Sequence, residues 1–270
     1  MDDRPSVGDV PRALSRKRSE RMLAALTLLD AGGSVSLSTL TDKLGVSAAT
    51  IRRDLADMED QGLLLRTHGG ARRRTALSEV PVRLRDSRFR EAKQQIARRA
   101  AELLPFGRYS VAISGGTTTA EVARVLAIRP ELAIITNSLT TAMAIASRPN
   151  LKVIMTGGVV RSNSFEAVGA LAENAFNSIN VGTAILGTDG ISARGGATTH
   201  DETEARTNHA MVAHAQRVMV VADGSKVGRL TLAKMADLGE IHILVTDSTA
   251  DGAELERIRA QGVEIHVVGT

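Results

Sequence analysis

Apolar residues recur at helical spacing in three short stretches near the N-terminus. The first lies around residues 22–29 and stops at a Gly-Gly pair. The second covers about residues 37–44, between serines at positions 36 and 38, either of which would cap the helix, and a terminating Gly45. Ser47 then caps a third helix. Two short helices joined by a tight turn predict a helix-turn-helix, and the run LLLRTHGGARRR after it predicts a small hairpin, which makes the domain a winged helix.

The rest of the chain alternates between apolar, β-branched runs and amphipathic segments. This alternation predicts a Rossmann-like, doubly wound and mainly parallel sheet, whose ligand site lies beyond the carboxyl ends of the strands. Glycines and polar residues gather at those ends. The runs expected as strands are residues 109–114, 132–136, 151–156, 183–187, 218–223, 241–247 and 264–269.

The fold class expected is therefore α/β, with a small N-terminal winged helix-turn-helix domain followed by a mainly parallel sheet domain. We expect four parts: a flexible N-terminus over 1–15, the winged helix-turn-helix over 16–73, a linker and the start of a connecting helix over 74–92, and an α/β effector domain over 93–270. The connecting helix is expected from about residue 85 to 104, with Ile96 and Ala100 on its apolar side.

Composition narrows the classes of function. The 270 residues are 43% hydrophobic and include no cysteine, which excludes disulfides and thiolate metal sites. Most of the net charge of +4 comes from residues 1–74, which suits a polyanionic partner there. The apolar run at 22–29 ends in an acid, and no run approaches the roughly 20 residues of a membrane-spanning helix. We expect a cytoplasmic protein without a membrane partner.

Two adjacent arginines, Arg52 and Arg53, lie on the third helix away from its apolar stripe. The N-terminal part of such a helix enters the major groove, where arginine meets guanine or phosphate. We therefore expect double-stranded operator DNA as a partner. The alternative is that the arginines pair with acids such as Asp57 on a solvated face. The residues expected to contact DNA are Ser47, Ala49, Thr50, Arg52, Arg53, Arg66 and His68.

The stretch GGTTTAEVARVL carries the most specific chemistry in the second domain. A strand ends at Ser114, two glycines let the backbone turn close to a ligand, and threonines begin a helix whose free N–H groups favour an anion. It has neither a Walker sequence nor G-x-G-x-x-G, so a nucleoside triphosphate or dinucleotide is not indicated. The alternative is that the glycines only turn the chain. Candidate effector-binding residues are Gly115, Gly116, Thr117, Thr118, Asn137, Ser138, Gly158, Asp189, Gly190 and Lys226.

The ordered motifs TIRRDL, GLLLRTHGGA, ISGGTTTAEVARVL, ITNSL, ILGTDGIS and ADGSKVG resemble the DeoR family of bacterial transcription regulators over nearly the whole chain. The resemblance implies an effector domain with a fold similar to ribose-5-phosphate isomerase, which binds phosphorylated sugars. Arg85 and Lys93 match a basic pair of the family. Three positions depart from its pattern, since the family has Asp at Ser114, Asp at Gly182 and often Lys at Asn208.

Two classes of function follow. The first is a transcriptional repressor of carbohydrate-metabolism genes, controlled by a small anionic metabolite and assembled as a homo-oligomer, a dimer or tetramer. The second is a sugar-phosphate isomerase-like enzyme with a DNA-binding appendage. We assign no catalytic residue, because no acid and base pair has a definable role. His200, Asp201 and Glu202 are adjacent and point apart on an extended segment, so we expect neither a metal nor a cofactor.

Overall fold

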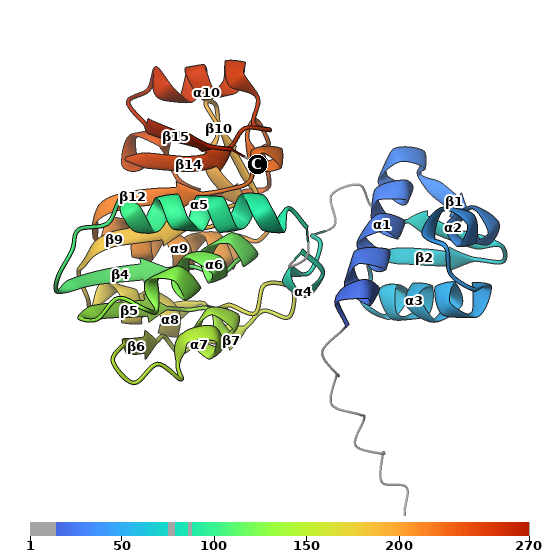
Figure 1. The fold of residues 1–270 in the computed structure, drawn as a ribbon, viewed down its shortest axis with the longest axis horizontal. Helices are drawn as coiled ribbons and strands as arrows, with labels where there is room; N and C mark the ends of the chain where they lie inside the picture. Colours follow the sequence, from blue (N-terminus) through green and yellow to red (C-terminus); the bar gives the residue numbers. More distant parts are fainter. Residues whose placement is uncertain (1–14, 75–78, 86–87, 270) are drawn as a thin grey trace, which may run out of the picture. The chain divides into compact units, whose positions relative to one another are not determined.

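The computed structural model describes residues 15–74, 79–85 and 88–269. The chain divides into two compact units, Met1–Arg88 and Phe89–Thr270, each considered by itself. The tail expected over residues 1–15 falls almost entirely outside the described residues. The helices and strands are coloured along the chain in Figure 1.

The first unit has the winged helix-turn-helix architecture that the sequence predicts. Its helices are α1 (Arg16–Gly32), α2 (Leu37–Leu44), α3 (Ala48–Asp60) and α4 (Val82–Arg85), and its strands are β1 (Ser34–Ser36), β2 (Leu64–Thr67) and β3 (Gly70–Arg73). The serine that caps α2 is Ser36, whose Oγ accepts from the Thr39 amide at 3.0 Å. Gly45 ends α2 with a φ of 62°, a conformation that favours glycine.

A single apolar core joins the helices of this unit. Ile51, Leu55 and Met58 form the buried stripe of α3 that helical spacing predicts. They pack with residues of α1, α2 and α4 in one cluster that includes Met22, Leu26, Leu29, Leu40 and Leu84. The expected hairpin is β2 paired with β3. β1 was not predicted from the sequence; it pairs antiparallel with β3 and extends the wing to three strands.

The second unit is built on a seven-stranded sheet in the order β15-β14-β12-β9-β4-β5-β6. All six pairings are parallel, as predicted. The chain enters the sheet at β4 and adds β5 and β6 on one side. It then returns to β9, on the other side of β4, and adds β12, β14 and β15 beyond it. The direction in which strands are added therefore reverses between β4 and β9. The strands are β4 (Tyr109–Ile113), β5 (Leu132–Thr136), β6 (Lys152–Met155), β9 (Val181–Leu186), β12 (Ala215–Val221), β14 (Ile243–Asp247) and β15 (Glu264–Val268).

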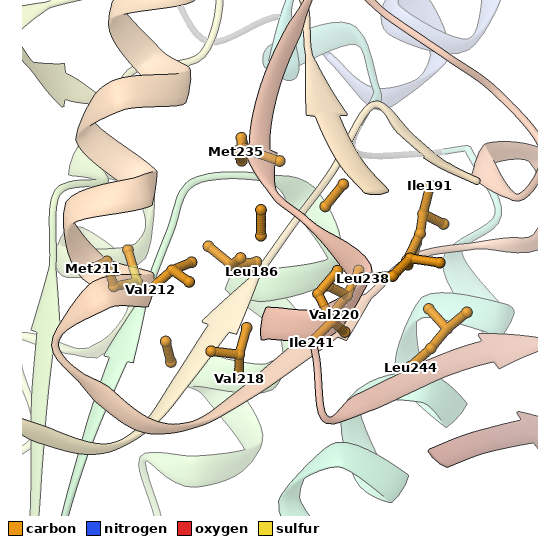
Figure 2. Packing of buried hydrophobic residues seen from close by; sticks show 14 of the residues in the cluster. Leu186, Ile191, Met211, Val212, Val218, Val220, Met235, Leu238, Ile241 and Leu244 are labelled. Carbon is orange, nitrogen blue, oxygen red and sulfur yellow. The ribbon is translucent and has the colours of Figure 1, made fainter. Parts of the chain in front are cut away.

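Successive residues of these strands point to opposite faces of the sheet and belong to two apolar cores, one on each face. Ile185 and Met219 belong to a cluster with α5, α6 and α7, which cover one face in Figure 1, whereas Leu186 and Val220 belong to a cluster with α8, α9 and α10. Figure 2 shows the second cluster. The helices are α5 (Arg90–Glu102), α6 (Thr117–Leu126), α7 (Leu139–Ile145), α8 (Ala170–Asn177), α9 (Glu202–Ala213) and α10 (Gly252–Arg259).

Two small antiparallel elements were not anticipated. One is a sheet of β10 (Gly190–Ser192), β11 (Gly196–Thr199) and β13 (Ala233–Ala236), and the other pairs β7 (Val159–Val160) with β8 (Ala167–Val168). Both lie between major strands in sequence, where short, glycine-rich segments give little periodicity.

The connecting segment differs from the expectation of one helix over 85–104. It forms α4 in the first unit, where Val82 and Leu84 are buried, and α5 in the second. Phe89 precedes α5 with a φ of 53°, which is not helical. The second unit therefore begins earlier than residue 93, and residues 79–85, expected within a linker, pack in the first unit. Ile96 and Ala100 are buried, as expected.

Candidate functional site

Most of the residues expected to contact DNA lie in the N-terminal half of α3 and at its cap. Ser47 caps the helix, its Oγ accepting from the Thr50 amide at 3.3 Å. Ala49, Arg52 and Arg53 are exposed. This half of α3 therefore offers a small side chain that permits close approach and two cations beside it.

The acids near these arginines are already paired with another helix. Asp54 is buried and accepts from Arg18 Nε at 2.9 Å and from Arg21 Nε at 2.5 Å. Asp57, the acid named in the solvated-face alternative, forms an ion pair with Arg18. Among the described residues, neither Arg52 nor Arg53 has an ion-pair partner. Asp54 and Asp57 thus fix α3 to α1 and leave its two outward arginines with unneutralised charge.

A groove of about 470 Å³ runs between α3 and the hairpin of β2 and β3. Arg52, Arg66 and His68 line it, together with Glu59. Arg66 is not a free cation, because its Nε lies 2.6 Å from Glu59 Oε2 and its backbone N–H also donates to Glu59. These hydrogen bonds, first from the Arg66 backbone and then from its side chain, lower the pKa of Glu59. Arg66 would have to share its charge between Glu59 and a phosphate.

The glycine turn after β4 lies at the reversal point of the sheet. Gly116 has a φ of 128°, and α6 begins at Thr117, with Thr118 buried in its first turn. Across the reversal, a Cβ on Gly187 would lie 2.8 Å from the Gly115 carbonyl oxygen. The ends of β4 and β9 therefore meet closely at the position where open α/β sheets bind ligands.

The candidates that follow β5 and β6 have structural partners. Ser138 caps α7, its Oγ accepting from the Thr141 amide at 3.2 Å. Gly158 has a φ of 138°, and a Cβ there would lie 2.7 Å from the Val168 carbonyl oxygen, so this glycine serves the pairing of β7 and β8. Asn137 donates to Asn208 Oδ1 at 3.3 Å. Its own Oδ1 is a buried acceptor with no hydrogen-bond partner among the described residues.

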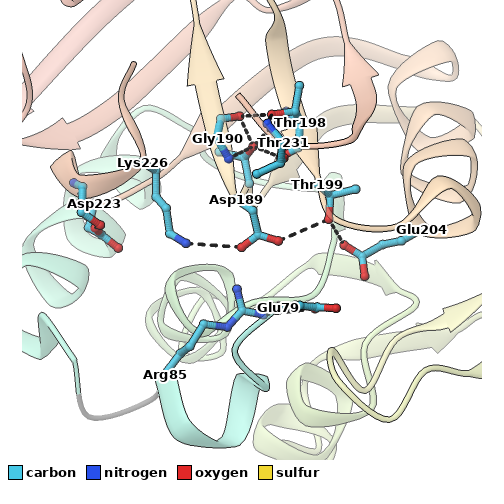
Figure 3. A network of polar contacts seen from close by, with 12 residues as sticks. Glu79, Arg85, Asp189, Gly190, Thr198, Thr199, Glu204, Asp223, Lys226 and Thr231 are labelled. Carbon is cyan, nitrogen blue, oxygen red and sulfur yellow. Dashed lines mark hydrogen bonds and ion pairs between the residues drawn. The ribbon is translucent and has the colours of Figure 1, made fainter. Parts of the chain in front are cut away.

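The candidates that follow β9 and β12 come together in a polar network, shown in Figure 3. Lys226 Nζ lies 3.3 Å from Asp189 Oδ1, and Thr199 donates to Asp189 Oδ2 at 3.3 Å. Thr199 also hydrogen-bonds Glu204 at 2.5 Å. Gly190 serves the fold, because a Cβ there would lie 2.5 Å from the Arg229 carbonyl oxygen. The network thus joins a lysine and two acids near the carboxyl ends of β9 and β12.

Sequence reasoning missed the residues that extend this network to the glycine turn. The Gly115 amide donates to Glu166 Oε1, and Arg161 forms an ion pair with Glu204. Burial raises the pKa of Glu166 well above its usual range, and the charge of Glu204 raises it further. The only sequence signal was an acid inside the apolar segment SFEAVG, whose following residues form the buried strand β8.

Each departure from the family pattern has a structural counterpart. Ser114 Oγ accepts from the Gly187 amide at 3.0 Å and so ties β4 to β9. The space beside Gly182 is filled by the ring of Tyr109, since a Cβ there would lie 2.2 Å from Tyr109 Cζ. Asn208 accepts from Asn137 as described above. The three positions have therefore become part of the packing of this domain.

Two kinds of feature are absent from the described part of the chain. Across residues 15–74, 79–85 and 88–269, no group of three His, Cys, Asp or Glu side chains is placed to hold a metal ion. No helix within those ranges is both long and apolar enough to span a bilayer.

Comparisons with known proteins agree with this architecture. Residues 19–76 match the DeoR-like helix-turn-helix domain and residues 88–248 match the DeoR C-terminal sensor domain. The chain is 38% identical over 248 residues to the HTH-type transcriptional regulator GlpR of Haloferax volcanii, covering 92% of this chain and 96% of that protein. It is 32% identical over 232 residues to the glycerol-3-phosphate regulon repressor of Escherichia coli K12, covering 86% of this chain and 92% of that protein.

A solved structure of ribose 5-phosphate isomerase A from Methanocaldococcus jannaschii aligns at 16% identity and a TM-score of 0.38, over 51% of this chain and 54% of that chain. The two matched domains follow one another over most of the chain, and the relatives match along nearly their full length. The protein therefore belongs to the DeoR family of transcription regulators, with a DNA-binding helix-turn-helix followed by a sensor domain.

Proposed function

We propose that this protein is a repressor of carbohydrate-metabolism genes whose affinity for operator DNA is set by a small anionic metabolite, a phosphorylated sugar, bound in the sensor unit. The observation that carries the proposal is that the Gly115–Thr118 turn follows β4 and the Lys226-paired Asp189 follows β9, the two strands between which the sheet order reverses. The name of the relative that represses a glycerol-3-phosphate regulon supports a phosphorylated ligand.

In this proposal, Arg52 and Arg53 of α3 carry the DNA contacts. Replacing Arg53 with Ala should weaken operator binding by about 1 to 3 kcal/mol and relax specificity at one base pair if it reads a base. If it contacts a phosphate, all sequences should weaken alike and the salt dependence should become shallower. The measurement is operator titration at several salt concentrations.

Arg259→Ala is the matched control, because it removes the same charge from an exposed position of α10 in the second unit. Arg52→Ala should behave in one of the two ways described for Arg53. Operator affinity unchanged in both α3 variants, with thermal unfolding also unchanged, would contradict the recognition-helix assignment.

The effector site is tested by Thr118→Ala and Lys226→Ala. The first removes a hydroxyl at the N-terminus of α6, and the second removes the cation beside Asp189. Neither residue lies in the first unit, so operator binding without ligand should persist. The response to ligand should weaken, because an effector acts only through its different affinities for two states.

The measurement is a screen of phosphorylated sugars for a change in operator affinity or melting temperature, repeated with both variants. A matched control is Lys234→Ala, which removes an exposed lysine of β13 whose Nζ pairs with Asp237 and not with Asp189. Variants that respond as strongly as the wild type would place the ligand elsewhere and leave the glycines as turns.

We infer that the protein regulates without catalysing a reaction. Isomerisation of a sugar phosphate requires a base at the α-carbon proton, and the acids of this site are engaged: Asp189 with Lys226, and Glu204 with Arg161. Incubation of the pure protein with ribose 5-phosphate should give no ketose product. Turnover that disappears in Asp189→Ala would overturn this inference in favour of the enzyme.

A further inference from the structure

The carboxyl group of Glu166 lies at the position where the glycine turn would hold an anion. Its Oε1 accepts a hydrogen bond from the backbone N–H of Gly115, which begins the turn between β4 and α6. A Cβ on Gly115 would lie 2.4 Å from Glu166 Cγ and 2.5 Å from Oε1, so only glycine permits this approach. The first amide of the turn is thus occupied by an acidic side chain of the same protein.

The backbone on both sides of Glu166 is held in place. Its carbonyl oxygen accepts from the Arg161 amide at 2.9 Å, and the following Ala167 amide donates to the Asn137 carbonyl oxygen at 2.7 Å. The segment is therefore anchored beside the end of β5. The Glu166 side chain, rather than the segment, is the part that a ligand would move.

Burial and the neighbouring Glu204 raise the pKa of Glu166 and so favour its neutral form, against the smaller opposing effects of the Gly115 amide and of Arg161. Glu204 of α9 faces it, and Arg161 of the segment after β7 forms an ion pair with Glu204. Both glutamates are buried, Glu166 at 2% and Glu204 at 6% exposure, and two such close carboxylates do not readily carry two charges. The neighbouring Glu204, which Arg161 pairs with, therefore favours the protonated form of Glu166.

We propose that Glu166 is a specificity-determining residue of the effector site, which occupies the Gly115 amide until a phosphate group takes its place and which a neutral hydroxyl does not displace. This inference rests on the proposed function, because it concerns the same site. Hydrogen bonds to a charged acceptor are about twice as strong as those to a neutral one. A phosphate therefore outcompetes the neutral carboxyl group for the amide, whereas a hydroxyl gains nothing by the exchange.

The test is calorimetric titration of the full-length protein with inorganic phosphate. Glu166→Ala removes the competitor and should tighten phosphate binding about fivefold, the factor that corresponds to one net hydrogen bond. Glu166→Gln retains an acceptor for Gly115 and a donor for Glu204, so at a pH where Glu166 is protonated its affinity should equal that of the wild type. Glu173→Ala on α8 is the control for loss of a nearby acid outside the site.

A pH series adds a result that a purely structural role would not produce. As pH rises, Glu166 ionises in the wild type and its charge opposes phosphate, whereas the glutamine variant does not titrate. The ratio of the wild-type Kd to the E166Q Kd should therefore increase with pH. The titration of phosphate itself cancels in this ratio. Since E166Q preserves the shape of the side chain, this comparison stands even where E166A is unstable.

Phosphate binding by E166A no tighter than that of the wild type, or absent from both, overturns the inference. A Kd ratio that stays constant with pH overturns it as well. Failure of the proposed function gives a different result, in which no metabolite alters operator binding. The phosphate titration is independent of that outcome, because it requires neither the operator nor the natural effector.

Discussion

Asp54 lies within the TIRRDL stretch, yet its role is in the fold. It is buried between the helices α1 and α3 and accepts from two arginines of α1. The acid that follows the two outward arginines thus fixes the angle at which α3 presents them. A sequence motif that identifies a DNA-binding helix therefore also contains the residue that holds this helix in position.

Replacing Asp54 with Ala should destabilise the protein by about 1 to 3 kcal/mol, because Arg18 and Arg21 lose a buried partner while remaining partly exposed. Chemical denaturation of the variant measures the loss. Asp60→Ala, at the exposed end of the same helix, is the control and should change stability little. Equal stability of the two variants would show that the ion pairs of Asp54 make no net contribution to the free energy of unfolding.

The raised pKa of Glu166 predicts a pH dependence of stability. An acid whose folded pKa is raised contributes fully below its unfolded pKa, where both states are protonated, and this contribution is lost as pH rises through the folded pKa. Glu166→Gln removes the dependence. The melting temperature of E166Q relative to the wild type should therefore rise as pH increases from the unfolded glutamate pKa, about 4.3, through the folded pKa. A constant difference over that range would contradict a buried, titrating carboxyl group.

At the scale of elements, the reversal between β4 and β9 depends on close contact between two glycine turns. Gly187→Ala should destabilise the protein by about 1 to 3 kcal/mol and weaken ligand binding, because its Cβ would press on the backbone of Gly115. Gly252→Ala in the first turn of α10 is the control, since a Cβ there meets nothing within 4 Å. The measurement is the melting temperature of both variants. Equal melting temperatures would mean that the turn after β4 shifts to accommodate the added Cβ without loss of stability.

The elements with strong periodicity were predictable from the sequence. Seven apolar runs became the seven parallel strands, and the stripe of Ile51, Leu55 and Met58 placed α3 correctly. The non-helical backbone at Phe89, which splits the expected connecting helix, left no such signal. A helical period reports which face is buried, and a single residue with positive φ does not change that period.

The candidate site was predictable only where residues follow strand ends directly. Parallel topology brings the Gly115 turn and Asp189 to one edge, so their proximity follows from the strand pattern. Glu166 reaches the same place through the short β7–β8 pairing, whose geometry depends on Gly158 and on hydrogen bonds distant in sequence. The side chain that occupies the first amide of the turn was therefore missed, although the turn itself was identified.

For the whole molecule, we predict a homo-oligomer, a dimer or tetramer. A single α3 reads only a few base pairs, and two-fold assemblies reading paired half-sites are the common solution for helix-turn-helix proteins. Light scattering at micromolar concentration should give a mass that is a multiple of the 28.6 kDa chain. A monomeric mass that persists when operator DNA is bound would contradict this prediction.

The filling of the Gly182 position by Tyr109 has a spectroscopic consequence. Tyr109 is the only tyrosine in a sequence that has no tryptophan, and all four phenylalanines also lie after residue 88. Its hydroxyl group lies 3.0 Å from Thr183 Oγ1, so the single native fluorophore joins β4 to β9. The intrinsic fluorescence of the unlabelled protein thus originates in the second unit alone. A fluorescence titration of the intact protein therefore reports on that unit, without a signal from the first, DNA-binding unit.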